Sequence, residues 1–213
     1  MESASNRSSY ERSALDLSEL NENPLVELKA WLETAHAYEP RIPEPAAMAL
    51  ATIDARMHPS VRFVLLRGLD ERGLRFFTSY DSPKGQQLDA RPNAAATFWW
   101  GALERQVRIE GTTRRLDDDE SDLYFASRPR GHQLAAWASE QSEMVESRSV
   151  LEERMTHFDE RFSEGEVERP HSWGGFLLLP DSIEFWQGRR DRLHDRILYR
   201  RERDRWERMR LQP

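Results

Sequence analysis

The stretch AAMALATIDARMHPSVRFVLLRGLDERGLRFFT (46–78) decides the fold class. It contains three short apolar runs, Ala46–Ile53, Ser60–Arg67 and Leu74–Thr78, and the two segments between them contain Asp, Gly and Pro. Short apolar runs that are bounded by such turn residues are typical of β-strands. The sequence therefore predicts a sheet of short strands in the middle of the chain.

The segments on either side of these strands extend the pattern. The pair Asn23-Pro24 is typical of a helix start, and apolar residues follow it at helical spacing, so a helix is predicted over 24–38. A shorter helix is predicted over 82–91, again from a cap residue followed by proline. After this helix, the runs Ala94–Trp100 and Glu104–Arg115 predict a β-hairpin.

The second half of the chain changes from helical to extended patterns. We expect helices over 119–127, 131–139 and 144–163, and then strands over Gly175–Leu179, Ile183–Gln187, His194–Arg201 and Arg205–Leu211. Strands, a helical insert and strands again form an α+β pattern. Because nothing divides this core, we predict one domain over 23–213, preceded by a mobile arm, 1–22, that is rich in Ser, Asn and Glu.

The composition excludes several classes of site. The 213 residues include no cysteine, which rules out disulfides, zinc–thiolate sites and iron–sulfur clusters. The six histidines have no metal-ligand spacing, and the sequence contains no dinucleotide fingerprint, P-loop or nucleophile elbow. No apolar run approaches the roughly 18 residues of a membrane span, and no secretory signal is visible. We therefore expect a cytoplasmic protein without a metal or a membrane contact.

The C-terminal stretch Arg189–Arg210 contains ten arginines, which suggests a nucleic-acid surface. Acidic residues are interleaved with these arginines, and the whole chain has a net charge of −7. A surface that follows a phosphate backbone has few carboxylates. We therefore predict no nucleic-acid partner.

Within this stretch, the sequence RLHDR (192–196) is the most informative. In an extended strand Arg192, His194 and Arg196 point to one face. Two guanidinium groups and an imidazole on one face either bind an anion or form a solvated face that is paired with carboxylates from another strand. The spacing alone does not decide between these two interpretations.

Three further motifs have a structural and a functional interpretation. Tyr124 and Arg128 are four residues apart on a predicted helix and could grip a phosphate, although a packing pair is the simpler interpretation. Residues 82–84, Ser-Pro-Lys, could hold a phosphate at a helix start, although simple capping is favoured. The acidic run Asp117–Glu120 is interpreted as a helix start and not as a metal site. Together, the clusters suit a phosphorylated, planar ligand.

Five segments then show a resemblance to a known family: RFVLLRG (62–68), LERQVRIEG (103–111), SRPRGHQLAAWASEQS (127–142), WGGF (173–176), and IEFWQG followed by RLHDR (183–196). In this order and at this spacing the chain, from about Arg7 to Pro213, resembles the pyridoxine (pyridoxamine) 5′-phosphate oxidases. The resemblance implies an FMN-binding split β-barrel of mainly antiparallel strands with flanking helices. It also implies a homodimer with FMN at the subunit interface, and oxidation of both phosphorylated substrates to pyridoxal 5′-phosphate by dioxygen.

The resemblance also implies the residues of the site. FMN contacts would fall on Arg62, Phe63, Val64, Leu65, Leu66, Arg67, Phe77, Thr78, Lys84, Gln106, Gln141, Ser142, Trp186 and Arg196. Substrate contacts would fall on Arg7, Tyr10, Arg67, Tyr124, Arg128, His132, Arg192 and His194, of which Arg192 and His194 would be catalytic. Arg62 and Lys84 would hold the flavin phosphate, and Tyr124 and Arg128 the substrate phosphate.

Three positions depart from the family pattern. Arg67 occupies a position where the family commonly has lysine, Pro83 one where an arginine usually touches the FMN phosphate, and His132 one where a serine is common. These departures concern affinity more than the type of reaction. Two alternatives stay open: another FMN split-barrel oxidase, such as a phenazine-biosynthesis oxidase, or a protein that binds FMN or pyridoxal phosphate without turnover.

Overall fold

The helices and strands of the middle region lie close to their predicted positions. The computed structural model describes residues 10–38 and 40–213. The strands are β1 (Ala47–Ile53), β2 (Pro59–Leu65), β3 (Gly68–Leu69), β4 (Leu74–Ser79), β5 (Asn93–Trp100), β6 (Arg105–Arg115), β7 (Trp173–Gln187), β8 (Asp195–Glu202) and β9 (Arg205–Leu211). The α-helices are α1 (Pro24–His36), α2 (Pro83–Ala90), α3 (Asp118–Ala126), α4 (Arg130–Ala138) and α5 (Arg148–Arg161).

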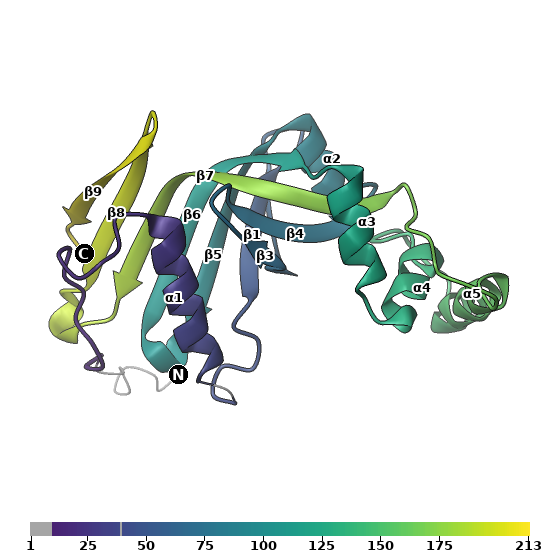
Figure 1. Ribbon diagram of the computed structural model, residues 1–213, viewed down its shortest axis with the longest axis horizontal. Coiled ribbons are helices and arrows are strands. Elements are labelled where there is room, and N and C mark those ends of the chain that lie inside the picture. Colours follow the sequence, from purple (N-terminus) through teal and green to yellow (C-terminus); the bar gives the residue numbers. More distant parts are fainter. Residues whose placement is uncertain (1–9, 39) are drawn as a thin grey trace, which may run out of the picture.

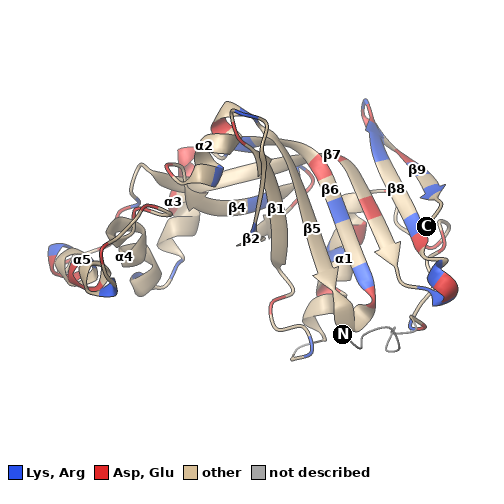
Figure 2. Cartoon of the chain, turned by 180° about the vertical axis from the view of Figure 1, so that it is seen from behind, with Lys and Arg blue, Asp and Glu red and all other residues tan. Residues whose placement is uncertain are grey.

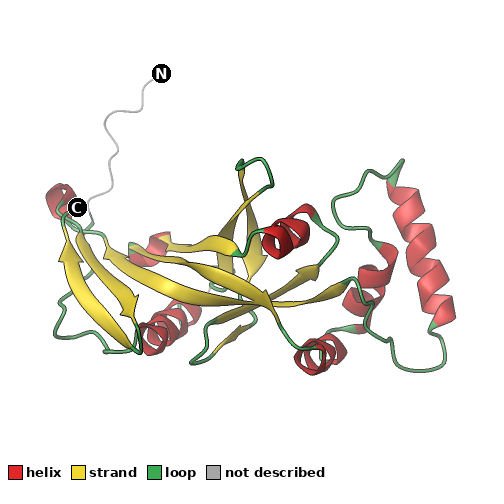
Figure 3. Ribbon diagram, turned by 90° about the horizontal axis from the view of Figure 1, so that it is seen from above, coloured by secondary structure: helices red, strands yellow, loops and turns green. Residues whose placement is uncertain are grey.

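Over the described residues the strands pair antiparallel in one nine-stranded sheet that curls into a half-barrel (Figure 1). The order β2-β1-β5-β6-β7-β4-β3 forms its main path, and β8 and β9 extend from β7. The first part of β7 pairs with β4, and its last part pairs with β8. The sheet therefore divides along β7 into two arms, which Figure 3 shows from above. The predicted α+β class is confirmed.

The prediction of two separate strands around Pro180 is wrong, because β7 runs through this residue. Proline has no amide proton and is excluded from the middle of most sheets. Here β4 pairs with β7 only as far as Leu178, and β8 pairs with it only from Ser182. On the other side, the β6 register shifts at Glu110/Gly111, opposite Pro180. The proline is therefore tolerated where the ladders on both sides are interrupted.

The close approach at this bulge requires a glycine. A Cβ atom on Gly111 would lie 2.1 Å from the Leu179 carbonyl oxygen, which belongs to the backbone and cannot move aside cheaply. We expect Gly111→Ala to lower the free energy of unfolding by about 1–3 kcal/mol, as overpacking does elsewhere. Gly131→Ala is the control, because a Cβ atom added at this position in α4 would have nothing within 4 Å of it. Urea unfolding of both variants tests this, and equal stabilities would contradict it.

Two apolar clusters position the rest of the molecule. The larger one lies between α1 and the sheet, where Leu28 and Trp31 pack among residues such as Phe98 and Phe185. Asn23 caps α1 as predicted, since its side chain accepts a hydrogen bond from the Leu25 amide. The smaller cluster joins α3 and α4 to Trp173 at the start of β7. The helical insert is therefore anchored at one end of the half-barrel.

Residues 10–22 make contacts that the sequence did not predict. Leu15 and Leu20 are buried in the larger cluster, and the Tyr199 hydroxyl donates a hydrogen bond to the Asn21 carbonyl at 2.7 Å. The mobility of the arm and the division at residue 22 stay predictions. The predicted substrate contact at Arg7 lies outside the described residues.

The predicted strand His194–Arg201 begins one residue late, and this changes the expected face of side chains. Arg192 lies in a short 3₁₀ turn, Arg190–Arg192, and has a φ of 63°, which is left-handed. The prediction that Arg192, His194 and Arg196 share one strand face is therefore wrong. The turn separates Arg192 from the strand that carries Arg196.

The acidic run forms a helix start, as predicted. Helix α3 begins at Asp118, and three of its carboxylates pair with arginines: Asp118 and Asp122 with Arg169, and Glu120 with Arg72. Among the helices that the structure describes, none has both the length and the apolar character that crossing a bilayer requires.

Candidate functional site

A pocket of about 700 Å³ lies between the sheet and the helical insert. It brings together many of the predicted contacts from β2, β4, α2, α3 and α4. Of the predicted FMN contacts it contains Phe63, Val64, Leu65, Arg67, Phe77, Thr78, Lys84 and Gln141, and of the predicted substrate contacts Arg67, Tyr124, Arg128 and His132. The sequence segments that supply these residues are far apart, so the pocket exists only in the folded chain.

One wall of the pocket is aromatic. The rings of Phe77 and Tyr124 stack with centroids 3.8 Å apart and planes 16° apart. Trp173 is parallel to both of them, with centroids 5.6 Å from Phe77 and 6.2 Å from Tyr124. Apolar aromatic surface beside a few polar groups is typical of sites for small organic ligands. This wall therefore fits a planar ring.

Lys84 is a buried cation without an acidic partner among the described residues. Its Nζ donates hydrogen bonds to Thr78 Oγ1 at 2.8 Å, Gln141 Oε1 at 2.9 Å and Ser82 Oγ at 3.0 Å. Burial, and then the nearby Arg62 charge, lower the pKa of Lys84 to about 8. Because a buried charge that is not paired costs free energy, this corner of the pocket would be stabilised by an anion.

Arg62 lies behind Lys84, outside the residues that line the pocket. Its guanidinium donates to Thr52 Oγ1 at 2.6 Å and Ser60 Oγ at 2.8 Å, and burial lowers its pKa. No carboxylate pairs with it within the part of the chain that the structure describes. Arg62 therefore adds to the positive potential at Lys84, and the donor set fits the phosphate of FMN.

A second cation without an acidic partner among the described residues, Arg128, also lines the pocket. The Arg128 guanidinium lies 4.5 Å from the centre of the Trp173 ring, and its Nη1 is buried without a hydrogen-bond partner. Burial is the main reason that its pKa is lowered, and the charge of Arg67 lowers it further. From the sequence we expected Arg128 to pack against Tyr124 if it did not bind a phosphate. In the structure its packing partner is Trp173. The unpartnered Nη1 leaves a donor for an anionic ligand.

The remaining predicted contacts form a separate cluster on β6, β7 and β8. Trp186 lies opposite Gln106 on β6 and opposite Arg196 on β8. The Arg196 guanidinium donates to both carboxylate oxygens of Glu184, at 2.7 and 3.1 Å. This pairing matches the solvated alternative for this residue, because a carboxylate from the neighbouring strand balances its charge.

His194 packs against Trp186 with ring centroids 4.6 Å apart, and Tyr10 lies edge-on to both rings at 5.8 Å. The Arg189 amide donates a hydrogen bond to His194 Nδ1 at 3.1 Å. Burial, and then the Arg192 charge, lower the pKa of His194. In its neutral form the imidazole therefore carries its proton on Nε2, which is free to donate.

The pocket residues and the cluster around Trp186 and His194 lie at opposite ends of the folded molecule. Figure 1 shows α3 and α4 at one end of the half-barrel and β8 with the C-terminus at the other. Leu66 is buried in the core, and Ser142 follows α4 as an exposed residue with a φ of 75°. A single chain therefore does not bring all of the predicted contacts together.

The arginine-rich C-terminal strands carry both signs of charge (Figure 2). Arg210 pairs with Asp195 at 2.7 Å, and Arg196 pairs with Glu184. Asp195 is one of the interleaved acidic residues that argued against a nucleic-acid surface, and Glu184 adds a carboxylate from the neighbouring strand β7. The absence of a nucleic-acid partner stays a prediction.

Comparison with known proteins assigns the family. Residues 34–161 match the family described as pyridoxamine 5′-phosphate oxidase. The chain belongs to this family. Residues 173–213 match the family's second profile, the pyridoxine 5′-phosphate oxidase C-terminal dimerisation region. This second match covers β7, β8 and β9, and therefore contains Trp186, His194 and Arg196.

Relatives named pyridoxine/pyridoxamine 5′-phosphate oxidase include proteins of Burkholderia mallei and Burkholderia pseudomallei. Each is 51% identical over 92% of this chain and 90% of its own length. A structure of PhzG from Burkholderia lata, in complex with tetrahydrophenazine-1-carboxylic acid, is 30% identical. It has a TM-score of 0.86 and covers 94% of this chain and 98% of its own.

A pyridoxamine 5′-phosphate oxidase-related, FMN-binding protein of Nostoc punctiforme shares the fold at 18% identity. Its TM-score is 0.68, and the match covers 94% of this chain and 100% of that protein. The predicted split barrel is confirmed by these structures. Family membership supports FMN as the cofactor, and the names of the relatives indicate an oxidase of this family.

Sequence reasoning missed Trp173 as a pocket residue, although it belongs to the quoted WGGF segment (173–176). Its ring completes the aromatic wall and lies against Arg128. The signal that could have indicated this residue is a tryptophan directly before two glycines. Gly174 is needed there because a Cβ atom on it would lie 2.0–3.0 Å from atoms of the Tyr80 side chain. This close packing fixes the start of β7 beside α3.

Proposed function

We propose that the chain oxidises pyridoxine 5′-phosphate and pyridoxamine 5′-phosphate to pyridoxal 5′-phosphate, with FMN as cofactor and dioxygen as electron acceptor. Hydrogen peroxide, and ammonia from the amine, would be the by-products. The observation that carries this proposal is the pocket itself, which the Phe77–Tyr124 pair lines together with Lys84 and Arg128, two cations that lack acidic partners among the described residues. Two separated cationic points beside a flat wall suit two phosphorylated rings.

The flavin phosphate would be held at the corner of Lys84. Lys84 supplies a charge, and Thr78 and Gln141 fix its ammonium group by hydrogen bonds. Arg62 strengthens the positive potential from behind. Helix α2 begins at Pro83, directly beside this corner, so the positive end of its dipole adds to the field. Pro83 supplies no amide proton, and the Gly85 amide already donates to Ser82 Oγ.

The substrate phosphate would be held by Arg128 and Tyr124. A guanidinium whose Nη1 has no partner within the described residues offers a charge-assisted hydrogen bond to a phosphate oxygen. Arg67 and His132 line the same pocket and supply further donors. Binding energy at a phosphate that is remote from the reacting carbon positions that carbon.

The second cluster would complete the site from another copy of the chain. The match to a dimerisation region supports a homodimer. Val61 and Phe63 on β2 and Trp99 on β5 are 68%, 76% and 52% exposed, and large apolar side chains in such an exposed group indicate an interaction surface. Two copies that pair through this face would supply Gln106, Trp186 and Arg196 to a pocket that lacks them.

Bound FMN would supply the hydride acceptor and the route of electrons to dioxygen. The residues of the chain bind and orient the substrate. The proton on His194 Nε2 can donate to a substrate oxygen or nitrogen, because Nδ1 is occupied by the Arg189 amide. Arg192, which ends the 3₁₀ turn two residues before His194, would stabilise negative charge on the pyridine ring.

The matched PhzG structure favours one alternative, an FMN oxidase that acts on a phenazine precursor. The decisive experiment records the visible absorbance of the purified protein and then adds pyridoxine phosphate in air. Release of peroxide together with a new aldehyde absorbance supports the proposal. Turnover of a reduced phenazine carboxylate alone would support the alternative, and bound flavin without any turnover would indicate a carrier. The cytoplasmic location stays a prediction.

Arg192→Ala tests the role of the second cluster. We expect kcat to fall by about tenfold to a hundredfold, since a charge that acts in the transition state is lost, while the flavin content of the protein stays unchanged. Steady-state turnover and the flavin absorbance measure these two quantities. Arg200→Ala is a matched control, because Arg200 is an exposed residue of β8. A variant that turns over at the wild-type rate would remove Arg192 from the mechanism.

A further inference from the structure

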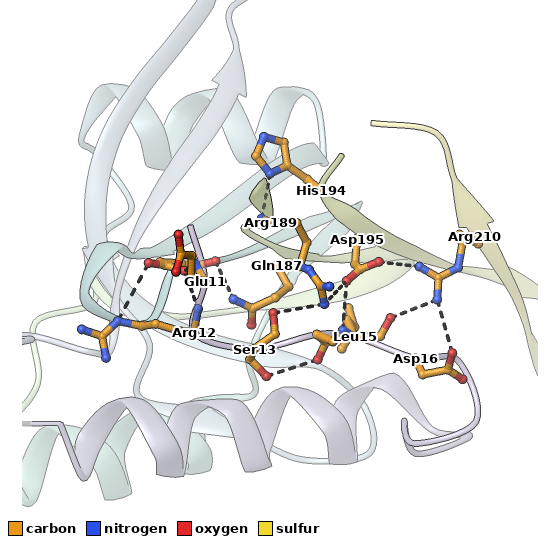
Figure 4. Close-up of polar contacts among 12 residues, drawn as sticks. Glu11, Arg12, Ser13, Leu15, Asp16, Gln187, Arg189, His194, Asp195 and Arg210 are labelled. Atoms are coloured by element: carbon orange, nitrogen blue, oxygen red, sulfur yellow. Dashed lines mark hydrogen bonds and ion pairs between the residues drawn. The ribbon is translucent and has the colours of Figure 1, made fainter. Parts of the chain in front are cut away.

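The N-terminal strap, residues 10–16, is fastened to the body of the protein by the carboxylate of Glu104. Figure 4 shows strap residues Glu11, Arg12, Ser13, Leu15 and Asp16 with the partners Asp195 and Arg210. Oε2 of Glu104 accepts hydrogen bonds from the amides of Glu11 at 2.9 Å and Arg12 at 3.1 Å. Hydrogen bonds to an ionised acceptor are about twice as strong as neutral ones. One side chain therefore fixes two consecutive amides directly after Tyr10.

The other end of the strap is held independently. Asp195 Oδ2 accepts a hydrogen bond from the Leu15 amide at 3.1 Å. Arg210 bridges the same two residues, because it donates to Asp195 Oδ1 at 2.7 Å and to the Leu15 carbonyl at 3.0 Å. Arg190 also pairs with the Glu11 carboxylate. Loss of the Glu104 contact would therefore loosen the start of the strap without releasing it fully, and would leave its end in place.

The body is shaped to receive Tyr10. A Cβ atom on Gly188 would lie 2.7 Å from Tyr10 Cγ and 3.1 Å from Glu104 Cβ. The Gly188 amide donates to the Glu104 carbonyl at 2.8 Å. Tyr10, Glu104 and Gly188 therefore form one packed unit, and a side chain at position 188 would displace the tyrosine.

Glu104 itself has an unusual backbone. Its φ of 55° is left-handed, at the end of the 3₁₀ turn Gly101–Leu103. A non-glycine residue in this region is under strain, and Asn is the residue that accepts it best. This backbone conformation favours Asn or Gly, but the residue here is a glutamate. Its carboxylate accepts the two hydrogen bonds from the strap. Strain of this kind is concentrated at functional sites.

We propose that Glu104 is a positioning residue for the substrate. Its carboxylate holds the strap so that Tyr10 stays against Trp186 and His194, and it acts on the substrate only through Tyr10. This inference rests on the proposed function for the His194 cluster. It assigns to Glu104 a role that is separate from the FMN and substrate contacts named above.

The test compares Glu104→Asn, which accepts the left-handed backbone but is too short to reach both amides, with Glu104→Gln, which keeps the reach. We expect Glu104→Asn to raise the KM for pyridoxine phosphate roughly tenfold, with unchanged flavin content. Glu104→Gln retains most of the wild-type KM. Glu110→Asn is the control, since Glu110 lies on β6, which follows Glu104, and pairs with Arg108 and not with the strap.

A double-mutant cycle with Tyr10→Ala decides whether Glu104 acts through the tyrosine. In the Tyr10→Ala background we expect Glu104→Asn to change KM no further, whereas additive effects would overturn the proposal. Trypsin cleavage after Arg12 gives a readout without activity, and it should be faster in Glu104→Asn than in wild type. A wild type without turnover refutes the proposed function, and an equal cleavage rate refutes the fastening by Glu104.

Discussion

We expect Lys84→Met to bind FMN about 10- to 150-fold more weakly than the wild type, because one charge-assisted hydrogen bond contributes about 1.5–3 kcal/mol. The methionine keeps much of the length of the side chain but removes the buried positive charge of the pocket that is coupled to Arg62. Thr78 and Gln141 then lose their shared donor. Titration of the apoprotein with FMN, followed by flavin fluorescence, measures the affinity.

The pH dependence of FMN binding follows from the same residue. In the free protein the pKa of Lys84 is lowered to about 8, mainly by burial. A bound phosphate favours the charged form and raises this pKa. Binding above about pH 8 therefore requires uptake of a proton, so affinity falls there by up to about tenfold per pH unit, and between about pH 7 and about pH 8 Lys84 adds no pH dependence. Lys84→Arg removes this dependence, because arginine stays charged.

Two outcomes would contradict the assignment of Lys84. One is a flavin affinity that is unchanged in Lys84→Met, and the other is a wild-type affinity that is flat from about pH 7 to about pH 9. Lys29→Met is the matched control. Lys29 is the other lysine of the chain and is exposed on α1, far in sequence from every pocket residue.

For Arg128→Ala we expect the KM for pyridoxine phosphate to rise about 10- to 100-fold, while FMN stays bound. The substitution removes the guanidinium that packs on Trp173, together with its Nη1 donor, which has no partner among the described residues. Arg128→Lys should recover only part of the affinity, because an ammonium group cannot form a forked pair with a phosphate. Steady-state kinetics with the phosphorylated substrate, at a fixed flavin content, measure the effect.

Arg130→Ala controls for loss of charge at the start of α4. Arg130 pairs with Asp159 on α5 and does not line the pocket. We expect its KM to equal that of the wild type. If Arg128→Ala left KM unchanged while Arg192→Ala raised it, the substrate phosphate would have to be assigned to the His194 cluster.

Much of the local structure could be predicted because it depends on neighbouring residues. The Asn23 cap of α1, the Ser82–Pro83 start of α2 and the start of α3 at the acidic run all lie where the sequence indicated. Each depends on a side chain that satisfies backbone groups within three or four residues. Local signals failed at Pro180, where the ladders of three neighbouring strands decide whether proline is tolerated.

The candidate site, too, could be predicted only in part. The residue types predicted a phosphate site near Tyr124 and Arg128. The ring that packs against the Arg128 guanidinium, however, belongs to Trp173, which is 45 positions away in the sequence. The prediction that Arg192 shares a strand face with Arg196 was wrong, because Arg192 lies in a left-handed turn before β8. Contacts such as Glu104 with the strap join segments that are separated by 92 and 93 residues, and no pattern in either segment indicates them.

The amino-acid sequence alone determined the α+β class, the helix starts and the chemical character of the pocket, since these follow from the order of apolar, turn and cationic residues. The tertiary structure decided which cations lack partners, where the strap is fixed, and that the two groups of site residues lie at opposite ends of the chain. The physical reason is that burial and charge pairing depend on distances between remote segments, which only the curled sheet sets.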